Sequence, residues 1–469
     1  MIRRAAGLGR PSKLEDPDTY EKCYAFCDVL VIGGGPAGLM AALAAAETDA
    51  RVIVCDEDFE FGGRLLTDKF EIDGAPAEAW RAAAVAKLAA NPNVTLMPRS
   101  TVFGVYDGNT YGVIERVGDH LPVPAPHTPR QRFWKVVAKR SILAAGSVER
   151  PIVFGGNDKP GVMMASAVRT YVNRFGAAPM RRFAVFANND DAWRTVADCA
   201  AAGVHVDAVI DSRKDLSPAL KAIAEAAGAR VYAGGQVLDA HGKRGVSAIS
   251  VHGADGHHSR IEVDGVAVSG GWNPNIGLTC HLGARPVWRD DLAAFVGDNL
   301  PSGMVAVGSA KGSLSLAACL AEGAAEGAKA ASDTGFSAKS VQVPSVAGTE
   351  STAMTPLFHV EAMKTKGFVD FQNDVTAKDI ALAHRENYKS VEHLKRYTTL
   401  GMATDQGKTG NVQGLAMMAA LTGKSIPETG ITTFRPPYVP IAVGAFGGHH
   451  RGKNFRPTRL TPSHRWAVE

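Results

Sequence analysis

Apolar and polar positions follow their clearest order near the N-terminus. A β-branched apolar run at 29–32 leads into a glycine-rich turn at 33–38, an alanine-rich segment follows, and a second apolar run occupies 52–55. Short β-branched runs predict buried strands, whereas a longer alanine-rich segment predicts a helix. The order of strand, glycine turn, helix and strand is typical of a dinucleotide-binding βαβ unit.

The glycine turn has a mechanical basis. Gly33 permits the tight turn after the strand, Gly35 allows the backbone to approach a pyrophosphate, and Gly38 lets the helix pack closely on the sheet. Pro36 and Ala37 open the helix, whose free N–H groups and positive dipole end favour phosphate groups. These five residues are candidate cofactor-binding residues.

Acidic residues follow the second strand. Asp56 or Glu57, about 20 residues after the glycines, is placed to accept hydrogen bonds from an adenosine ribose, and Asp58 comes directly after them. An acid at this point favours FAD or NAD over NADP, because it would repel a 2′-phosphate. All three are candidate cofactor-binding residues.

Later segments are predicted to complete the same domain. A helix is expected at 78–90, strands at 94–105, 141–146 and 304–309, and a final helix from about 314 to 330. The turns and ends of these elements add further candidate cofactor-binding residues: Gly63, Arg64, Val102, Ala145, Gly146, Gly308, Ser309 and Leu314.

Two of these positions bear on the nature of the cofactor. The Gly-Gly pair at 62–63 occupies the place where two-domain flavoproteins carry a turn beneath the dinucleotide, although a plain β-turn would fit it equally. In such flavoproteins the last strand usually ends in Gly-Asp, and the Asp binds the flavin ribityl chain. This chain has Ser309 there, which favours an NAD held without turnover over FAD.

A second set of apolar runs predicts another Rossmann-like domain. Its first strand is expected at 183–186 and its second at 204–210, but the turn at 187–193, ANNDDAW, contains no glycine. A pyrophosphate could not approach this backbone closely, and Asp190 and Asp191 would repel it. We predict a domain that keeps the fold without a second nucleotide, which argues against a reductase that uses NAD(P)H.

The predicted fold class is α/β, with a two-domain glutathione-reductase-like Rossmann fold of the FAD/NAD(P)-binding type and a small helical module. The segment 331–356 is assigned as a linker because its residues lack periodicity. The other expected units are an N-terminal extension (1–27), a dinucleotide-binding domain (28–150 and 265–330), a second Rossmann-like domain with a degenerate nucleotide turn (151–264), the helical module (357–430) and a C-terminal docking tail (431–469).

Bulk composition narrows the class of protein. The chain of 469 residues is 45% hydrophobic and carries a net charge of +4 over a mixed-sign sequence, which gives no case for nucleic-acid binding. Its six cysteines are scattered, as in a reducing compartment. Because no apolar run approaches the ~20 residues of a membrane helix and no signal-peptide core follows the basic start, we expect a cytoplasmic protein. His449-His450 fits a solvated loop better than a metal site, and no metal ligands are predicted.

The helical module has its own start signals. Thr376 and Asp379 have the spacing of a capping box, and Ser390 could cap a second helix. The layout resembles the ferredoxin-type 2Fe–2S module of bacterial opine, proline and cyanogenic amine dehydrogenases, whose helices present cysteine ligands. A cluster needs thiolates, so the module is predicted to be a helical brace with no 2Fe–2S cluster. The four corresponding positions here are Asp370, Gln372, Asp405 and Gly410.

Longer motifs carry a family resemblance over nearly the whole chain. They are IRRAAGLG at 2–9, DPDTY at 16–20, RTYVNRFG at 169–176, FANNDDAWR at 186–194, SGGWNP at 269–274, FVDFQNDVTAKDIALA at 368–383 and KRYTTLGMATDQGKTGN at 395–411. On these motifs the chain resembles the central portion of the α subunit of heterotetrameric sarcosine oxidase.

The resemblance implies a place in an assembly of α, β, γ and δ subunits that oxidises sarcosine to glycine with O2 as acceptor, in one-carbon metabolism. In that family the β subunit carries the FAD that takes the substrate hydride, and an FMN attached to β lies at the α/β boundary. The α subunit holds an NAD that does not turn over. No catalytic residue is therefore predicted in this chain, which is expected to be inactive alone. The segment 435–438, RPPY, is a candidate for docking a partner subunit near the FMN.

The resemblance also has departures. Family α subunits begin with an extra ferredoxin-like domain and end with a folate-binding domain, so we expect a split subunit, a truncated reading frame or a fragment, to which folate chemistry cannot be assigned. Two alternatives stay open: a non-catalytic nucleotide-binding scaffold, and the α subunit of an opine, proline or N-methyl amine dehydrogenase. The missing cluster cysteines argue against the second.

Overall fold

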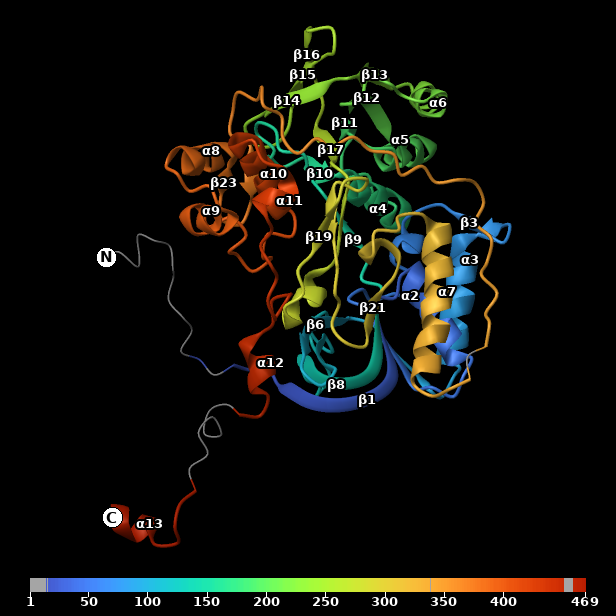
Figure 1. The fold of residues 1–469 in the computed structure, drawn as a ribbon, viewed down its shortest axis with the longest axis vertical. Helices are drawn as coiled ribbons and strands as arrows, with labels where there is room; N and C mark the ends of the chain where they lie inside the picture. Colours follow the sequence, from blue (N-terminus) through green and yellow to red (C-terminus); the bar gives the residue numbers. More distant parts are fainter. Residues whose placement is uncertain (1–13, 15, 338, 451–458) are drawn as a thin grey trace.

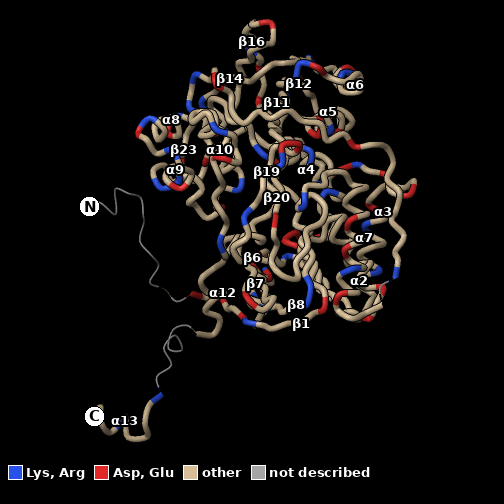
Figure 2. The backbone as a smooth tube through the Cα atoms, in the orientation of Figure 1, with Lys and Arg blue, Asp and Glu red and all other residues tan. Residues whose placement is uncertain are grey.

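The computed structural model describes residues 14, 16–337, 339–450 and 459–469, and the motif at 2–9 lies outside them. Two open sheets, one above the other in Figure 1, organise the described chain, and the helical module lies beside the upper sheet. Figure 2 shows acidic and basic residues interspersed over these parts, in keeping with the mixed-sign sequence. Within the described ranges, no helix has the length and apolar character needed to span a membrane.

The first sheet has the strand order β5-β2-β1-β8-β7-β6, and β21 also pairs with β8. All of its strand pairs are parallel except those that involve β6 and β7, which form an antiparallel meander with the first half of β8. Its strands are β1 (Tyr20–Ile32), β2 (Val52–Cys55), β5 (Val94–Met97), β6 (Ser100–Tyr106), β7 (Thr110–Glu115), β8 (Gln131–Leu143) and β21 (Met304–Ala306).

Three helices pack together on one side of this sheet, namely α2 (Pro36–Ala46), α3 (Ala77–Ala89) and α7 (Leu316–Asp333). α2 is alanine-rich and almost entirely buried, so it sits at the centre of the core rather than at its surface. Glycines on α7 allow the two helices to approach closely, since a Cβ on Gly323 would lie 2.3 Å from the carbonyl oxygen of Ala37. The helices expected at 78–90 and 314–330 are thus confirmed.

β1 is much longer than the apolar run at 29–32 suggested. It starts at Tyr20 and pairs in parallel register with β8 from Tyr20 to Ile32. Residues 20–27 alternate between more and less exposed side chains, so they carry no continuous apolar signal. Residue 28, where the dinucleotide-binding domain was expected to begin, lies inside this strand.

The second sheet is fully parallel, with the order β10-β17-β11-β12-β13. Its helices are α4 (Ala165–Phe175), α5 (Asp191–Ala201) and α6 (Pro218–Ala227), and an antiparallel sheet of β14 (Gln236–His241), β15 (Ala248–His252) and β16 (His258–Ile261) lies next to it. The strands expected at 183–186 and 204–210 are confirmed. The strand bounds are β10 (Val162–Met164), β11 (Arg182–Ala187), β12 (His205–Asp211), β13 (Arg230–Ala233) and β17 (Gly265–Ser269).

The chain crosses between the two sheets twice. The outward crossing, β9 (Ser147–Glu149), pairs antiparallel with the return crossing, β18 (Trp272–Pro274). Smaller pairs are formed by β3 (Glu71–Ile72) with β4 (Ala75–Pro76) and by β19 (Val287–Arg289) with β20 (Ala294–Val296).

The helical module packs on the part of the molecule that contains the second sheet. Its two start signals are confirmed: Asp379 and Thr376 form a capping box, and the Ser390 hydroxyl accepts a hydrogen bond from His393 N–H at 3.2 Å. Gln413 fixes the module by donating to the carbonyl oxygen of Pro151 at 2.9 Å. The elements are β22 (Phe368–Asp370), β23 (Val375–Thr376), α8 (Ala377–Arg385), α9 (Val391–Thr398), α10 (Asn411–Thr422) and α11 (Ile426–Thr429), followed by α12 (Val443–Gly447) and α13 (His464–Val468).

The segment predicted as a linker is held against both sheets. α7 extends to Asp333 and so includes its first residues. Val346 then forms a β-bridge with Ile72 beside the first sheet, and Met354 forms one with Asn189 beside the second. We refer to residues 345–355 as the strap.

Candidate dinucleotide-binding site

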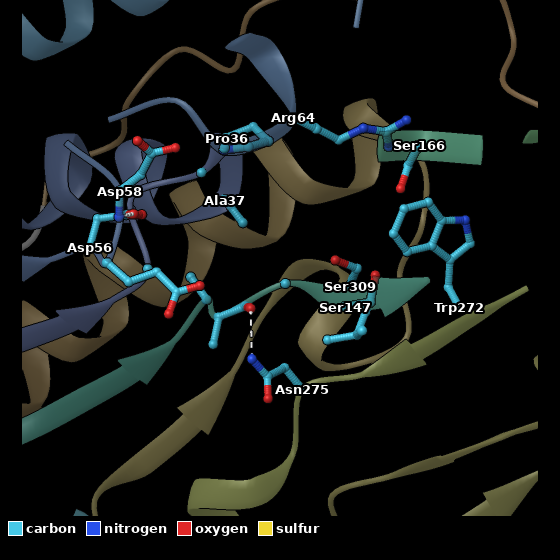
Figure 3. A pocket seen from close by; sticks show the side chains of 18 of the residues that line it. Pro36, Ala37, Asp56, Asp58, Arg64, Ser147, Ser166, Trp272, Asn275 and Ser309 are labelled. Atoms are coloured by element: carbon cyan, nitrogen blue, oxygen red, sulfur yellow. Dashed lines mark hydrogen bonds between the residues drawn. The ribbon is translucent and has the colours of Figure 1, made fainter. Parts of the chain in front are cut away.

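A cavity of about 1300 Å³ opens at the carboxyl ends of the first sheet's strands and continues toward the second sheet. Figure 3 shows its course, from Asp56 past Pro36 and Ala37 to Trp272 and Ser166 at the opposite end. Ligands of open α/β sheets bind in the crevice outside the carboxyl ends of the strands. The cavity therefore lies where the sequence places a dinucleotide.

The predicted cofactor-binding residues converge on this cavity. Gly38 and Gly308 stand just behind its wall: a Cβ on Gly38 would lie 1.9 Å from the carbonyl oxygen of Gly33, and one on Gly308 would lie 2.9 Å from the Cβ of Ala37. These two glycines therefore serve close packing. The others line the cavity: Gly33, Gly35, Pro36, Ala37, Asp56, Glu57, Asp58, Gly63, Arg64, Val102, Ala145, Gly146, Ser309 and Leu314.

The glycine turn leaves open space at one position. Gly33 has a φ of +102°, and a Cβ there would lie 2.3 Å from the carbonyl oxygen of Ala144. At Gly35 the nearest atom to an added Cβ is the Cα of Gly63, at 3.9 Å. Gly63 in turn has a φ of +54° and no room for a side chain against Gly35. The Gly-Gly turn at 62–63 thus packs directly against Gly35, the residue of the glycine-rich turn that faces the cavity.

The acid at the end of β2 is fixed by the backbone. Asp56 Oδ2 accepts a hydrogen bond from Gly34 N–H at 2.5 Å, and Oδ1 accepts one from Asp58 N–H at 2.8 Å. Burial raises the pKa of Asp56. Asp58 is different: burial opposes its ionisation, but hydrogen bonds from Arg174 outweigh this and lower its pKa. Glu57 is exposed at the rim.

Arg64 lines the cavity with its guanidinium already engaged. It donates to Asp68 at 2.9 Å, to the carbonyl oxygen of Leu314 at 2.8 Å and to Glu350 of the strap at 2.9 Å. Arg169 and Arg194 complete the cluster from the second domain, since Arg169 contacts Asp68 at 2.9 Å and Arg194 contacts Glu350 at 2.8 Å. The cluster joins both sheets and the strap.

The end of the cavity opposite Asp56 is polar and aromatic. Asn275 is oriented by its side-chain amide, which donates to the carbonyl oxygen of Ala145 at 3.4 Å. A flat ring with hydrogen-bonding substituents would find both kinds of contact there. The residues that form this end are Ser147, Ser166, Trp272, Asn275 and Ser309.

The second nucleotide turn is covered by the chain itself. Asp190 N–H donates to the carbonyl oxygen of Ala353 at 3.0 Å, and Thr355 N–H donates to that of Asn188 at 2.9 Å. The Asp190 carboxylate pairs with Arg213 at 2.6 Å. The missing glycine and the two acids predict that this turn binds no nucleotide. The strap, which covers the turn, is a further obstacle to a nucleotide there.

Comparisons with known proteins give the family. The sarcosine oxidase subunit alpha of Rhizobium meliloti (strain 1021) is 47% identical over 468 residues, covering 100% of this chain. The chain belongs to the sarcosine oxidase α-subunit family. The α subunit of Corynebacterium sp. (strain P-1) is 40% identical over 98% of the chain. The chain spans about half the length of these relatives, 47% and 49% respectively.

Family models match two parts of this α-subunit-family chain. The FAD binding domain matches residues 28–67, and the sarcosine oxidase A3 domain matches residues 364–450. Among solved structures, the L-proline dehydrogenase from P. horikoshii has a TM-score of 0.67 at 20% identity, covering 91% of this chain and 80% of that one. Thioredoxin reductase of T. acidophilum has a TM-score of 0.51 at 14% identity over 66% of this chain and 99% of that one. The fold is α/β and FAD-binding Rossmann-like.

The four module positions that correspond to cluster ligands make local contacts, and Asp405 accepts a hydrogen bond from Gly407 N–H at 3.1 Å. Asp370 accepts a hydrogen bond from Gly401 N–H at 2.8 Å, and Gln372 accepts one from the Thr404 hydroxyl at 3.3 Å. Gly410 is the N-cap of α10. Among the described residues, no group of three or more His, Cys, Asp or Glu is arranged to hold a metal ion. The side chains of Asp370, Gln372 and Asp405 thus accept hydrogen bonds within the module's loops.

The segment 435–438 divides between surface and interior. Its first three residues are exposed, but Tyr438 is buried and its hydroxyl donates to Asn275 at 2.6 Å. Lys408 Nζ from the module lies 4.1 Å from the Tyr438 ring, and both line the cavity. Tyr438 therefore belongs to the cavity wall and is not free to dock a partner, while Arg435 stays available for the predicted contact.

Sequence reasoning missed the cavity residues that come from distant segments. Arg169 and Trp272 stand in motifs that were noted only for the family resemblance. Glu350 lies in a segment without periodicity, and nothing in the sequence marks it. Lys408 and Tyr438 approach from the module and the tail, so only tertiary structure reveals them.

Proposed function

We propose that this chain is an α-subunit component of a sarcosine-oxidase-type complex, which demethylates sarcosine oxidatively to glycine with O2 as acceptor. The chain holds NAD in the cavity of its first domain, contributes to an FMN site at the boundary with a β-type subunit, and works with β, γ and δ subunits in the cytoplasm. The observation that carries this proposal is the 47% identity, over the whole chain, to the sarcosine oxidase subunit alpha of Rhizobium meliloti.

The geometry of the first domain supports a dinucleotide. Gly35 faces open space beside the start of α2, whose N-terminal N–H groups favour a pyrophosphate. Asp56 stands at the end of β2, where it can accept hydrogen bonds from the adenosine ribose. The match to the FAD binding domain covers only residues 28–67, which bind the part that FAD and NAD have in common.

Two features favour NAD over FAD in this cavity. Ser309 stands where a flavoprotein of this architecture has the carboxylate for the ribityl chain. In addition, Glu350 already occupies the N-terminus of α7, where its carboxylate accepts a hydrogen bond from Leu316 N–H. That position attracts electronegative groups, so a flavin oxygen would have to compete with a fixed carboxylate.

The roles of the other parts follow from the proposal. Oxidation of the substrate belongs to a β-type subunit, no residue of this chain is assigned as catalytic, and the isolated chain is inactive. The module is a cluster-free version of a ferredoxin-type domain, because Asp370, Gln372, Asp405 and Gly410 offer no thiolate.

The test is to identify the cofactors of the assembled protein. The chain is purified alone and after co-expression with its β-like partner, and the nucleotides released by denaturation are identified by mass spectrometry. NAD from the chain, with FMN only in the complex, is the expected result, and the complex should turn over sarcosine faster than proline or an opine. FAD from the chain alone would contradict the argument from Ser309. The absence of any nucleotide would favour a scaffold.

A matched pair of variants locates the nucleotide. Gly35→Ala should remove NAD, because the methyl group fills the space beside the pyrophosphate. Gly447→Ala is the control, since a Cβ there meets nothing within 4 Å. NAD retained in Gly35→Ala would place the nucleotide elsewhere in the protein.

A further inference from the structure

The strap forms one wall of the dinucleotide cavity. Residues 350–354 line it, and residues 351–353 are exposed. The strap is anchored beside the first sheet by the Val346–Ile72 bridge and beside the second by the Met354–Asn189 bridge. It therefore spans the cavity from one domain to the other.

Glu350 is the most heavily bonded side chain of the strap. Its Oε1 receives Arg64 Nη2 at 2.9 Å and Arg194 Nη1 at 2.8 Å. Its Oε2 receives Leu316 N–H at the start of α7, and only 16% of its side chain is exposed. Two guanidinium groups and a helix N-terminus make an anion site, and here the anion is supplied by the chain itself.

The partners of Glu350 belong to different domains. Arg64 and α7 are parts of the first domain, whereas Arg194 lies on α5 of the second. One carboxylate thus joins the strap to both domains. Opening the strap requires all three contacts to break, and Arg64 and Arg194 each then lose one of their carboxylate partners.

The strap is held independently a few residues further on. The Ser351 hydroxyl donates to the Asp190 carboxylate, and the backbone bonds of Ala353 and Thr355 fix the strap on the second nucleotide turn. The turn that would bind a second nucleotide therefore serves as the docking site of the strap.

We infer that Glu350 is a positioning residue that latches the strap over the bound dinucleotide and sets the rate of its release. The inference rests on the proposed function, since it needs a dinucleotide in this cavity. It adds a cause for retention: the ligand leaves only when the ion pairs of Glu350 with Arg64 and Arg194 open. Asp56 and the glycine turn set affinity at one end, and the latch controls exit.

The experiment measures dinucleotide release from the co-expressed complex. Wild type, Glu350→Ala and the control Glu262→Ala are diluted, and the dinucleotide freed over time is separated by filtration and quantified by mass spectrometry. Glu262 is a suitable control because it is exposed and forms an ion pair with Arg260, two residues before it. Glu350→Ala should release dinucleotide at least about tenfold faster, and Glu262→Ala should match wild type.

Chemical rescue distinguishes a latch from general loosening of the structure. Glu350→Ala leaves the site of Arg64, Arg194 and the α7 N-terminus without its anion, so added formate should bind there and slow release again. Sodium chloride at the same ionic strength should not. Unchanged release in Glu350→Ala, or equal effects of formate and chloride, would overturn the latch.

A second variant keeps the inference testable if Glu350→Ala folds poorly. Ser351→Ala removes the contact with Asp190 and leaves the α7 N-terminus intact, and it should speed release about threefold. Release from Ser351→Ala at the wild-type rate would count against the strap as the barrier to exit. Wild-type complex with no dinucleotide would overturn this inference and the NAD proposal together, whereas bound dinucleotide with unaltered release would overturn the latch alone.

Discussion

Asp56 and Gly34 are joined by a hydrogen bond of 2.5 Å from the Gly34 N–H to Asp56 Oδ2. This bond ties the end of β2 to the glycine turn after β1 and holds the acid at the cavity, where we propose that the adenosine ribose binds. Glu57, the other acid considered from the sequence, is exposed at the rim of the cavity. The geometry thus favours Asp56 over Glu57 as the ribose-binding acid, a choice that the sequence left open.

Asp56→Asn should weaken dinucleotide binding about 10–100-fold, because hydrogen bonds to a charged group contribute about 1.5–3 kcal/mol. Glu57→Gln should change the affinity by less than about twofold, since an exposed rim charge contributes little. Calorimetric titration of nucleotide-stripped protein measures both. An equal loss in the two variants would assign the ribose contact to the acidic pair as a whole.

Gly35→Ala and Gly38→Ala should fail in different ways. A Cβ on Gly38 would lie 1.9 Å from a carbonyl oxygen, so Gly38→Ala should lower the free energy of unfolding by about 1–3 kcal/mol or more. Gly35 has a φ of −72° and open space around it, so Gly35→Ala should keep the stability and lose at least about tenfold in affinity. Urea denaturation and calorimetry separate the two effects, and a large loss of stability in Gly35→Ala would contradict the assignment.

The sequence predicted the elements whose signals are local. The βαβ unit, the parallel strands of the second domain, and the capping box and N-cap of the module all follow from residues that are neighbours in the chain. The start of β1 was missed because residues 20–27 alternate and depend on pairing with β8 for their burial. The order of the strands in both sheets also needed the structure.

From the sequence, only the part of the candidate site that lies in the first domain could be predicted. The glycines and Asp56 belong to one contiguous motif. By contrast, Glu350 meets Arg64 and Arg194 across long stretches of chain, and a single carboxylate in an aperiodic segment carries no signal of such contacts. Tyr438 belongs to the segment predicted to dock a partner subunit, whereas packing against Gly277 buries it.

The cysteines should differ in reactivity with Ellman's reagent. Among the six, all within the described part of the chain, Cys23 is half-buried and the others are buried. Burial raises the pKa of Cys27 to about 12 and that of Cys319 to about 11, so few thiolates form at the pH of the assay. About one thiol should react quickly in the native protein, and Cys23→Ser should abolish that phase. A fast phase that survives in Cys23→Ser would show that a buried cysteine is accessible.

Glu149 should make the stability depend on pH. It lies in β9 with 4% of its surface exposed and accepts a hydrogen bond from Ser166 N–H at 2.8 Å. Burial raises its pKa from 4.5 to about 7. Between these values the folded chain keeps a proton that the unfolded chain has lost, so the unfolded state binds fewer protons. The free energy of unfolding therefore falls as pH rises from 4.5 to about 7.

Glu149→Gln isolates this effect, because the amide does not titrate and keeps an oxygen for Ser166 N–H. The free energy of unfolding of the variant minus that of wild type should increase by roughly 3 kcal/mol across this pH range. Urea denaturation at several pH values measures the difference, in which the other titrating groups cancel. The infrared band of a protonated carboxyl group should also disappear from wild type as pH rises through about 7 and be absent from the variant. A difference in stability that is constant with pH would mean that Glu149 is already ionised in the fold, and that its charge is stabilised by Ser166 and the start of α4.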